Sequence, residues 1–182
     1  MNDPDHDAPE QVMWTGRFIT AKTRGKWEYV SRARGIQAAV ILAIDEAADG
    51  RHILLVDQYR VPLGRRCIEL PAGLVGDEQE GEDATLAAAR ELEEETGYRP
   101  ARLEPLGQFW SSPGMVSESF SLFRAHGLEK RGEGGGVDNE DIRVHRVPLA
   151  DLPDRIAAWR AEGYAMDVKL LLLLGAGMMA PA

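Results

Sequence analysis

Residues 76–98 read GDEQEGEDATLAAARELEEETGY, and the interpretation of the whole chain starts from this stretch. Strong helix formers fill its middle, and Gly97 follows directly after Glu95-Thr96. Alanine and leucine favour a helix, whereas glycine commonly occupies the first position beyond a helix C-terminus. The stretch therefore predicts a helix from Asp83 to Thr96 that ends before Gly97.

The protein has 182 residues and a formal net charge of −9, and most of that charge lies in the same stretch. Between Asp77 and Glu95 there are nine acidic residues and one base, Arg90, so this segment carries −8 and the remainder is nearly neutral. An acidic protein surface repels a phosphate backbone, so we expect no nucleic acid partner. A local acidic block leaves two interpretations, a solvated face or a cation site.

The glutamates near the end of the predicted helix favour the cation site. Glu94 and Glu95 lie three and four residues after Glu91, so a helix places all three on one face. Like charges one turn apart destabilise a helix, and so does negative charge near its C-terminus. A divalent cation relieves both penalties, and carboxylates are the ligands that Mg²⁺ or Mn²⁺ prefers. On these glutamates alone, a solvated helix face remains the alternative.

The spacing around the glutamates carries a stronger signal. Five residues separate Gly76 from Glu82, and seven more separate Glu82 from Arg90-Glu-Leu-Glu-Glu-Glu-Thr-Gly-Tyr. This pattern resembles the Nudix box, G-x5-E-x7-R-E-U-x-E-E-x-G-U with U apolar or aromatic, at every fixed position. In many relatives a Pro-Ala-Gly sequence supplies the first glycine, but here that glycine is Gly73, three residues too early. Either Gly73 or Gly76 fills the structural position.

The resemblance implies a fold and a chemistry. Nudix proteins are α/β/α sandwiches with a mixed sheet, and they hydrolyse a nucleoside diphosphate linked to another group. It implies that two or three Mg²⁺ ions, with Mn²⁺ as a substitute, bind beside the box, and that Arg90 orients the glutamates through charge-assisted hydrogen bonds. It assigns catalytic roles to Arg90 and Glu94. The metal ligands that it implies are the Ala72 carbonyl, Glu91, Glu94 and Glu95.

Other segments resemble the ADP-ribose pyrophosphatase branch of this family. Residues 68–73 read IELPAG, and residues 58–60 read QYR, in which the arginine position contacts substrate in that branch. Pro113 follows the box at an offset typical of the branch, and Gly114 comes next. The resemblance therefore implies that Arg60, Pro113 and Gly114 bind substrate. A surface arginine at a strand end and an ordinary Pro-Gly turn are the alternatives.

Residues 138–145, DNEDIRVH, resemble the late loop that supplies the catalytic base in this branch. Alignment places the base on Asp138, where relatives commonly have glutamate, while Glu140 is longer by one methylene and lies two residues on. Both are candidates, and reach favours Glu140. The glycines at 134–136 predict a mobile loop that closes over substrate, with an acidic turn before a strand as the alternative. His145 is expected to face outward.

Residues 1–33 resemble the small domain through which ADP-ribose pyrophosphatases form an intertwined dimer. We therefore expect a homodimer, with 1–33 as a small N-terminal β subdomain, of which 1–10 are disordered, and 34–182 as the Nudix domain. In that branch both subunits contribute to nucleobase recognition, which makes Trp27 and Arg32 candidate substrate-binding residues. For Trp27, a place in the interface or the core is an equally open alternative.

The remaining pattern predicts an α/β fold with strands on both sides of the acidic helix. Residues 36–44 form an almost continuous apolar run, which is typical of a strand buried on both faces. Two further helices are expected at 152–162 and 166–174. The other expected strands are 14–23, 26–33, 52–60, 67–70, 103–110, 117–126 and 142–148. Strands, one helix, strands and then helices indicate mixed rather than regular βαβ order.

Composition limits the cellular setting. The single cysteine, Cys67, excludes an intrachain disulfide, and no apolar run reaches the length that spans a bilayer. The acidic N-terminus is unlike a signal peptide. We expect a cytoplasmic protein with no membrane partner.

The sequence thus favours Mg²⁺-dependent hydrolysis of ADP-ribose to AMP and ribose 5-phosphate. Hydrolysis of another nucleoside diphosphate sugar, such as GDP-mannose, is the nearest alternative. A catalytically silent Nudix module that binds a nucleotide is a third interpretation, which the complete glutamate set disfavours.

Overall fold

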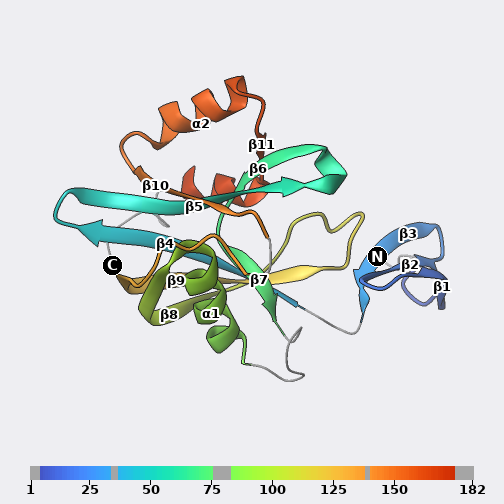
Figure 1. The fold of residues 1–182 in the computed structure, drawn as a ribbon. Coiled ribbons are helices and arrows are strands. Elements are labelled where there is room, and N and C mark those ends of the chain that lie inside the picture. Colours follow the sequence, from blue (N-terminus) through green and yellow to red (C-terminus); the bar gives the residue numbers. More distant parts are fainter. Residues whose placement is uncertain (1–4, 34–36, 76–82, 138–139, 175–182) are drawn as a thin grey trace.

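The computed structural model describes residues 5–33, 37–75, 83–137 and 140–174 (Figure 1). Two α-helices are present in this part of the chain, α1 (Ala84–Thr96) and α2 (Leu152–Ala161), with the 3₁₀ helices η2 (Val61–Leu63) and η3 (Val168–Leu174). The strands are β1 (Glu10–Thr15), β2 (Ile19–Arg24), β3 (Trp27–Arg32), β4 (Gln37–Ala47), β5 (Gly50–Arg60), β6 (Arg65–Glu69), β7 (Ala72–Val75), β8 (Tyr98–Trp110), β9 (Ser119–Lys130), β10 (Arg143–Pro148) and β11 (Ala165–Met166).

The central strand β4 changes partners along its length. Its first half lies between β7 and β9, so that Val40 pairs with both Ala72 and Leu122. Its last residues pair with β5, beginning at Ile44 and Ile53. The main sheet has the order β11-β6-β5-β4-β9-β8, with β10 beside β5 and β7 beside β4. The β4–β9 and β6–β11 pairs are parallel and the others antiparallel, so the sheet is mixed, as predicted.

Alternate residues of β4 face two different apolar clusters, which explains its unbroken hydrophobic sequence. Val40 and Leu42 belong to the cluster that contains Trp159 of α2. Ile41 belongs to the cluster that contains Leu92 of α1. In Figure 1 the two helices accordingly cover opposite faces of the sheet. The predicted α/β/α sandwich is therefore confirmed.

Helix α1 forms where the sequence predicts it, because both of its ends are capped. The Asp83 carboxylate accepts hydrogen bonds from the backbone N–H groups of Thr85 at 2.8 Å and Leu86 at 3.2 Å. Gly97 adopts a left-handed φ of 76°, and its N–H donates to the Glu93 carbonyl at 2.8 Å. These contacts satisfy backbone groups that a helix terminus otherwise leaves without partners.

The N-terminal segment differs from expectation in two ways. The single strand predicted over 14–23 is divided into β1 and β2, and the Trp14 ring folds over the break at Gly16, where a Cβ would lie 2.3 Å from it. Disorder was expected for the first ten residues, but Glu10 begins β1 and accepts a 2.5 Å hydrogen bond from the Tyr29 hydroxyl. Strands β1, β2 and β3 form a separate three-stranded sheet, seen on the right in Figure 1.

The helix predicted over 166–174 begins two residues later and is a 3₁₀ helix. Met166 lies in β11, which pairs with β6, and the following N–H of Asp167 donates to the Ile68 carbonyl at 3.0 Å. The Asp167 carboxylate then accepts the N–H of Lys169 at 2.7 Å, which starts a 3₁₀ helix. Pairing with the sheet therefore overrides the helical propensity of this apolar run.

Strand β7 was missed, because the Pro-Ala-Gly sequence indicates a turn. Instead, Ala72 and the residues after it add a strand beside β4. Gly73 faces the side chain of Glu91, and a Cβ at this position would lie 2.0 Å from the Glu91 Cδ atom. Gly73 thus leaves room for a glutamate of α1, while Gly76 lies outside the described residues.

No helix within the described ranges is long and apolar enough to cross a membrane.

Candidate active site

A cavity of about 440 Å³ lies where the C-terminal half of α1, strand β7 and the ends of β5 and β6 meet. Its polar character is set by six carboxylates and four cationic side chains. These are Glu69, Glu91, Glu94, Glu95, Glu118, Glu140, Arg32, Arg60, Arg90 and Lys169. The cavity therefore gathers three glutamates of the box, both predicted arginine contacts and the late-segment glutamate into one site.

Glu91 and Glu95 project from α1 into a partly water-excluded environment. Glu95 is only 8% exposed, and its Oε2 atom accepts the backbone N–H of Ala72 at 3.0 Å. Burial raises the pKa of Glu95 to about 8, against the lowering effect of the Ala72 hydrogen bond. Burial likewise raises the pKa of Glu91 to about 7. Glu140 contributes to both increases through charge repulsion, which places its carboxylate within electrostatic reach of this pair.

Arg90 bridges two of the glutamates. Its Nη2 atom lies 3.1 Å from Glu91 Oε1, and its Nη1 atom lies 3.1 Å from Glu94 Oε2. The guanidinium thus holds both carboxylates on the face of α1 that lines the cavity. This is the arrangement through which the sequence resemblance implies that Arg90 orients the glutamates.

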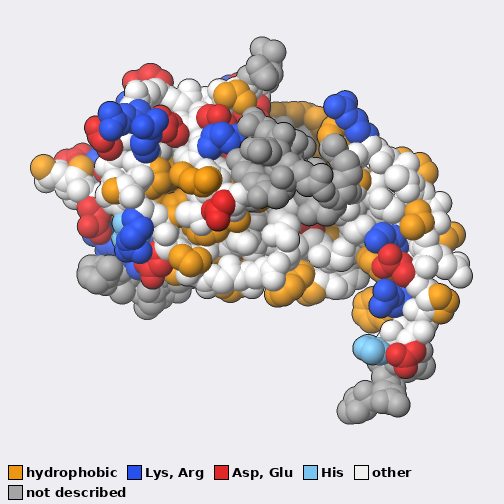
Figure 2. Space-filling model, turned by 90° about the horizontal axis from the view of Figure 1, so that it is seen from below, with side chains coloured by type: hydrophobic (Ala, Val, Ile, Leu, Met, Phe, Trp, Pro, Cys, Tyr) orange, Lys and Arg blue, Asp and Glu red, His pale blue; other side chains and the backbone are white. Residues whose placement is uncertain are grey.

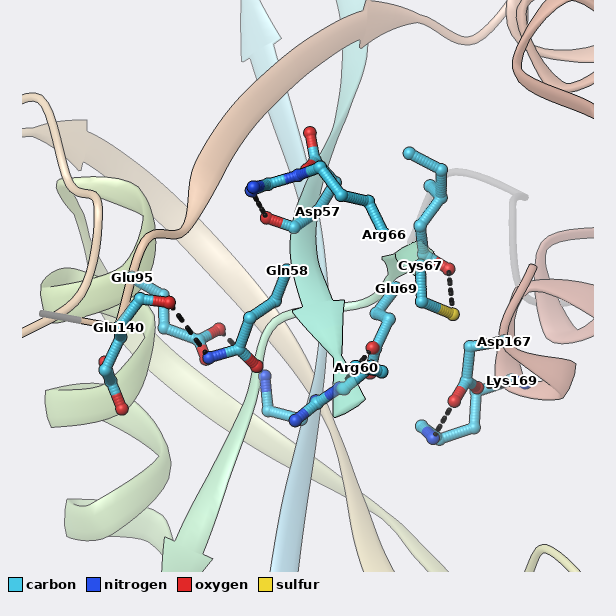
Figure 3. Close-up of polar contacts among 12 residues, drawn as sticks. Asp57, Gln58, Arg60, Arg66, Cys67, Glu69, Glu95, Glu140, Asp167 and Lys169 are labelled. Atoms are coloured by element: carbon cyan, nitrogen blue, oxygen red, sulfur yellow. Dashed lines mark hydrogen bonds and ion pairs between the residues drawn. The ribbon is translucent and has the colours of Figure 1, made fainter. Parts of the chain in front are cut away.

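Two further arginines in the cavity are held by carboxylates. Arg60 donates from Nε and Nη2 to Glu69 at 2.6 and 2.9 Å, and this bidentate contact raises its pKa. Glu69 is buried, so the pair is fixed at the end of β6. Arg32 Nε similarly donates to Glu118 at 2.5 Å. Figure 3 shows Arg60 beside Glu69, on the side of Gln58 away from Glu140.

Glu140 reaches the same cavity from the segment before β10. Its Oε2 atom accepts the N–H of Val137 at 3.1 Å, and its carbonyl accepts a hydrogen bond from Gln58 Nε2 at 3.2 Å (Figure 3). Asp138, the other candidate base, lies outside the described residues.

The glycines before Glu140 are docked on α1, which differs from the mobile loop that their sequence predicts. The N–H groups of Gly135 and Gly136 donate to the carbonyls of Glu95 at 2.9 Å and Glu94 at 3.0 Å. A Cβ on Gly134 would lie 2.5 Å from the Glu95 carbonyl oxygen. Close approach of two backbones therefore accounts for the glycine at 134, and positive φ values favour glycine at 135 and 136.

The other predicted substrate-binding residues line a second cavity, of about 360 Å³. Trp27, Pro113 and Gly114 lie there with Tyr29 of the three-stranded sheet. The predicted substrate residues are therefore divided between two cavities within one chain. Because Trp27 belongs to the separate N-terminal sheet, its distance from the box could not be inferred from sequence spacing.

Sequence reasoning missed Lys169, which lines the 440 Å³ cavity from η3. Its Nζ atom pairs with Asp167 at 2.6 Å and lies 5.7 Å from the centre of the Phe120 ring. One lysine in an apolar C-terminal run carries no signal that would have marked it. Glu69 was missed too, although its position directly before Leu-Pro-Ala-Gly, nine residues after Arg60, is visible in the sequence.

The site resides in a recognisable domain, because residues 35–166 match the NUDIX domain. The chain belongs to the Nudix family. The family match ends three residues before Lys169, so this cation comes from outside the matched Nudix domain.

Curated relatives of this Nudix protein have several names. It is 39% identical over 58% of its length to the methanol dehydrogenase activator of Bacillus methanolicus, and spans 54% of that protein. It is 33% identical to the ADP-ribose pyrophosphatase of Saccharomyces cerevisiae, over 86% of this chain and 74% of the relative. Identity is also 33% to the GDP-mannose pyrophosphatase of Cronobacter sakazakii, over 83% of this chain and 76% of the relative.

A solved structure supports the fold. The crystal structure of an ADP compounds hydrolase superimposes with a TM-score of 0.65 and 22% identity, covering 91% of this chain and 89% of that one. This likeness extends over nearly the whole chain and shows that the two proteins share a fold.

The donor set fits the divalent metal ions that Nudix hydrolases generally use. Glu91, Glu94 and Glu95 offer hard oxygen ligands, and burial disfavours the charged form of two of them until a cation is near. Within the described ranges no three acidic, histidine or cysteine side chains converge into a preassembled metal cluster. Arg90 instead bridges two of the carboxylates.

We predict that the metal-free protein becomes less stable as pH rises from about 5 to about 8. Glu91 and Glu95 have raised pKa values of about 7 and about 8 in the fold and ordinary values near 4.5 when unfolded. The folded state therefore binds more protons in this range, and the stability present at low pH is lost as pH rises through the folded values. Urea unfolding in EDTA at successive pH values measures this decline.

Glu95→Gln is the matched control, since it removes one of the two titrations. Its decline is expected to be shallower by at most about 1.4 kcal/mol per pH unit, the effect of one proton. Identical pH slopes for the wild type and the variant would contradict the assignment.

Proposed function

We propose that this Nudix protein is a hydrolase that splits the pyrophosphate of ADP-ribose into AMP and ribose 5-phosphate with the help of Mg²⁺. One observation carries the proposal: the box glutamates, Arg60 and Glu140 line the same cavity. Water adds across one P–O bond of the bridge, so two phosphomonoesters are released. The complete glutamate set supports an enzyme acting on pyrophosphate bonds and not a silent binding module.

Charge explains why a metal is needed. When all of its groups are ionised, as metal binding requires, the cavity has two more carboxylates than cationic side chains, so a pyrophosphate is repelled unless positive charge is added. When bound, Mg²⁺ or Mn²⁺ ions neutralise phosphate oxygens and lower the pKa of a nearby water. One divalent ion offsets the excess carboxylates and a second offsets the two charges of the pyrophosphate. This balance calls for two ions, and the family resemblance implies two or three, held by the Ala72 carbonyl, Glu91, Glu94 and Glu95.

The chain's own residues orient the substrate and move the proton. Glu140 holds the attacking water and accepts its proton, with Asp138 as the alternative base. Arg90 keeps Glu91 and Glu94 directed toward the cavity. Arg60 is held beside the site by Glu69 and donates to a phosphate oxygen of the bound substrate.

The nucleobase fits the second cavity. Trp27 offers a ring face for stacking, and Pro113 and Gly114 line the same hollow. Arg32 lines the catalytic cavity and an adjoining hollow that also contains Ser117, which in turn lines the second cavity. These shared residues connect the proposed base and phosphate sites.

The same N-terminal sheet supports a homodimer. Val12, Met13 and Trp14 of β1 are each more than half exposed, as is Phe18. Figure 2 shows this sheet projecting from the main body, with hydrophobic and charged side chains interspersed on its surface. Strand β1 is also an edge of its sheet, which favours pairing with a second copy.

GDP-mannose is the second candidate substrate. Identity to the GDP-mannose pyrophosphatase extends over 83% of the chain and equals that to the yeast ADP-ribose pyrophosphatase. The similarity of residues 58–60 and 68–73 to the ADP-ribose branch favours ADP-ribose over it.

We predict faster cleavage of ADP-ribose than of GDP-mannose in the presence of Mg²⁺. Chromatography of released AMP or GMP gives kcat/KM for each substrate. Glu95→Gln should lower both rates at least about a hundredfold, because it replaces a carboxylate ligand by an amide. Faster release of GMP would reverse the substrate order, and undiminished turnover by the variant would refute the metal assignment.

Variants of the late segment distinguish the two candidate bases. Glu140→Gln should lower kcat by about 10² to 10⁴ with little change in KM, since an amide cannot accept the proton. Asp138→Asn, measured alongside, should have the smaller effect. The reverse order assigns the base to Asp138, and normal turnover by both variants excludes a base in this segment.

The dimer is tested by sedimentation of the whole chain. We expect the wild type to sediment as a dimer and Trp14→Glu as a monomer, because a buried charge opposes association. Val61→Glu, at an exposed apolar residue of η2, is the control and should stay dimeric. A monomeric wild type, or equal effects of the two substitutions, contradicts a dimer through this sheet.

A further inference from the structure

A buried aspartate joins three neighbouring strands close to the catalytic cavity. Asp57 of β5 is fully buried, and its carboxylate accepts a hydrogen bond from Arg66 Nε of β6. Arg66 Nη2 also donates to the Asp57 carbonyl at 3.0 Å. On the other side, His145 Nε2 of β10 lies 2.7 Å from Asp57 Oδ2. His145 therefore faces this buried group and not solvent, contrary to expectation. Figure 3 shows the contact between Asp57 and Arg66.

The same arginine extends to the residue that follows Glu140. Arg66 Nη1 donates to Asp141 Oδ2 at 2.7 Å, and Nη2 donates to the Asp141 carbonyl at 2.7 Å. The hydrogen bond from Arg66 lowers the pKa of Asp141. Arg66 thus binds both the side chain and the backbone of Asp141, and buried Asp57 fixes the position of Arg66.

Asp141 has an unusual backbone conformation at this contact. Its φ is 48°, and among the described residues it is the only one other than glycine with a positive φ. This conformation is disfavoured for residues with a side chain, although aspartate tolerates it better than most. The two hydrogen bonds from Arg66 stabilise this conformation, because one binds the Asp141 side chain and the other binds the Asp141 carbonyl.

The backbone on both sides of Asp141 is also held by hydrogen bonds. Gln58, the neighbour of Asp57 on β5, holds the Glu140 carbonyl at 3.2 Å. Beyond Asp141, the N–H of Ile142 donates to the Gly135 carbonyl at 3.3 Å, and Gly135 is itself docked on α1. The backbone around Glu140 is therefore tied to β5 and β6 on one side and to the metal-site helix on the other.

We propose that Arg66 and Asp141 are positioning residues that set the carboxylate of Glu140 for proton transfer. The chain of contacts runs from buried Asp57 through Arg66 to the left-handed Asp141, and so to the preceding residue. A general base must lie within hydrogen-bond distance of the water that it deprotonates, and misplacement by about 1 Å slows reactions about a hundredfold. This inference rests on the proposed function, in which Glu140 is the base.

Asp141→Asn is the main test, because asparagine has nearly the same shape and tolerates a positive φ but loses the charge that binds Arg66. The Asp141 side chain is 69% exposed, so the variant is expected to fold. We expect kcat to fall about tenfold with KM within about twofold of the wild type. Arg66→Lys, which cannot make the forked contact, should have a larger effect of the same kind. Arg65→Lys, at the exposed neighbouring position, should leave both constants unchanged.

A double-mutant cycle separates positioning from a general structural role. In a Glu140→Gln background, Asp141→Asn should slow the reaction no further, because there is no base left to position. Additive losses in the cycle, or normal kcat in Asp141→Asn, would overturn the inference while the role of Glu140 stands. If Glu140→Gln itself is fully active, the base assignment of the proposed function fails, and the inference fails with it.

Discussion

Burial of carboxylates in the last turns of α1 is the constraint on which the site depends. Glu95 is 8% exposed at the end of a helix whose dipole disfavours negative charge there. Desolvation opposes its ionisation, as the raised pKa records, and the Ala72 N–H compensates only in part. The neighbouring elements are arranged around this charge: β7 supplies an amide, Arg90 bridges Glu91 and Glu94, and the cavity admits a cation.

The backbone carbonyls of Glu94 and Glu95 also hold the segment on the opposite side of the site. Carbonyls at a helix C-terminus lack partners within the helix. Those of Glu94 and Glu95 accept the N–H groups of Gly136 and Gly135. A helix end that presents its side chains to the proposed metals thereby holds the segment that carries Glu140. The side chains of Glu94 and Glu95 and the segment before Glu140 are therefore attached to the same two residues of α1, so a small shift of α1 moves both together.

Local signals made much of this predictable. Helix-forming residues and the glycine at 97 defined α1, and the apolar run defined β4 as a strand buried on both faces. The Nudix spacing placed Arg90 and the glutamates on one face of the helix, which the cavity lining agrees with. Each of these depends on residues that are close in sequence.

The features that sequence did not predict depend on contacts between distant segments. Strand β7 forms because β4 offers an edge, and η3 replaces an α-helix because Asp167 bonds to β6. The glycines at 134–136 have a composition typical of mobility, yet they lie against residues distant in sequence, with Gly134 packed on the end of α1. Trp27 was likewise predicted to contact substrate, but it lines a cavity beside the N-terminal sheet, and no local sequence pattern predicts where that sheet packs.

The ion pairs in the cavity explain how a protein with a net charge of −9 can bind an anion. Arg32, Arg60 and Arg90 are each engaged by a glutamate, whereas the hydrogen bonds described for Glu95 and Glu140 come from backbone amides. An incoming phosphate therefore meets arginines that are already paired with glutamates, beside carboxyl groups whose described hydrogen bonds come from backbone amides. Binding an anion here requires either that the arginines exchange partners or that new positive charge enters near Glu95. Breaking a bidentate pair such as Arg60–Glu69 is unfavourable, so anion binding is better explained by added cations. A protein with a net charge of −9 can then bind an anionic substrate.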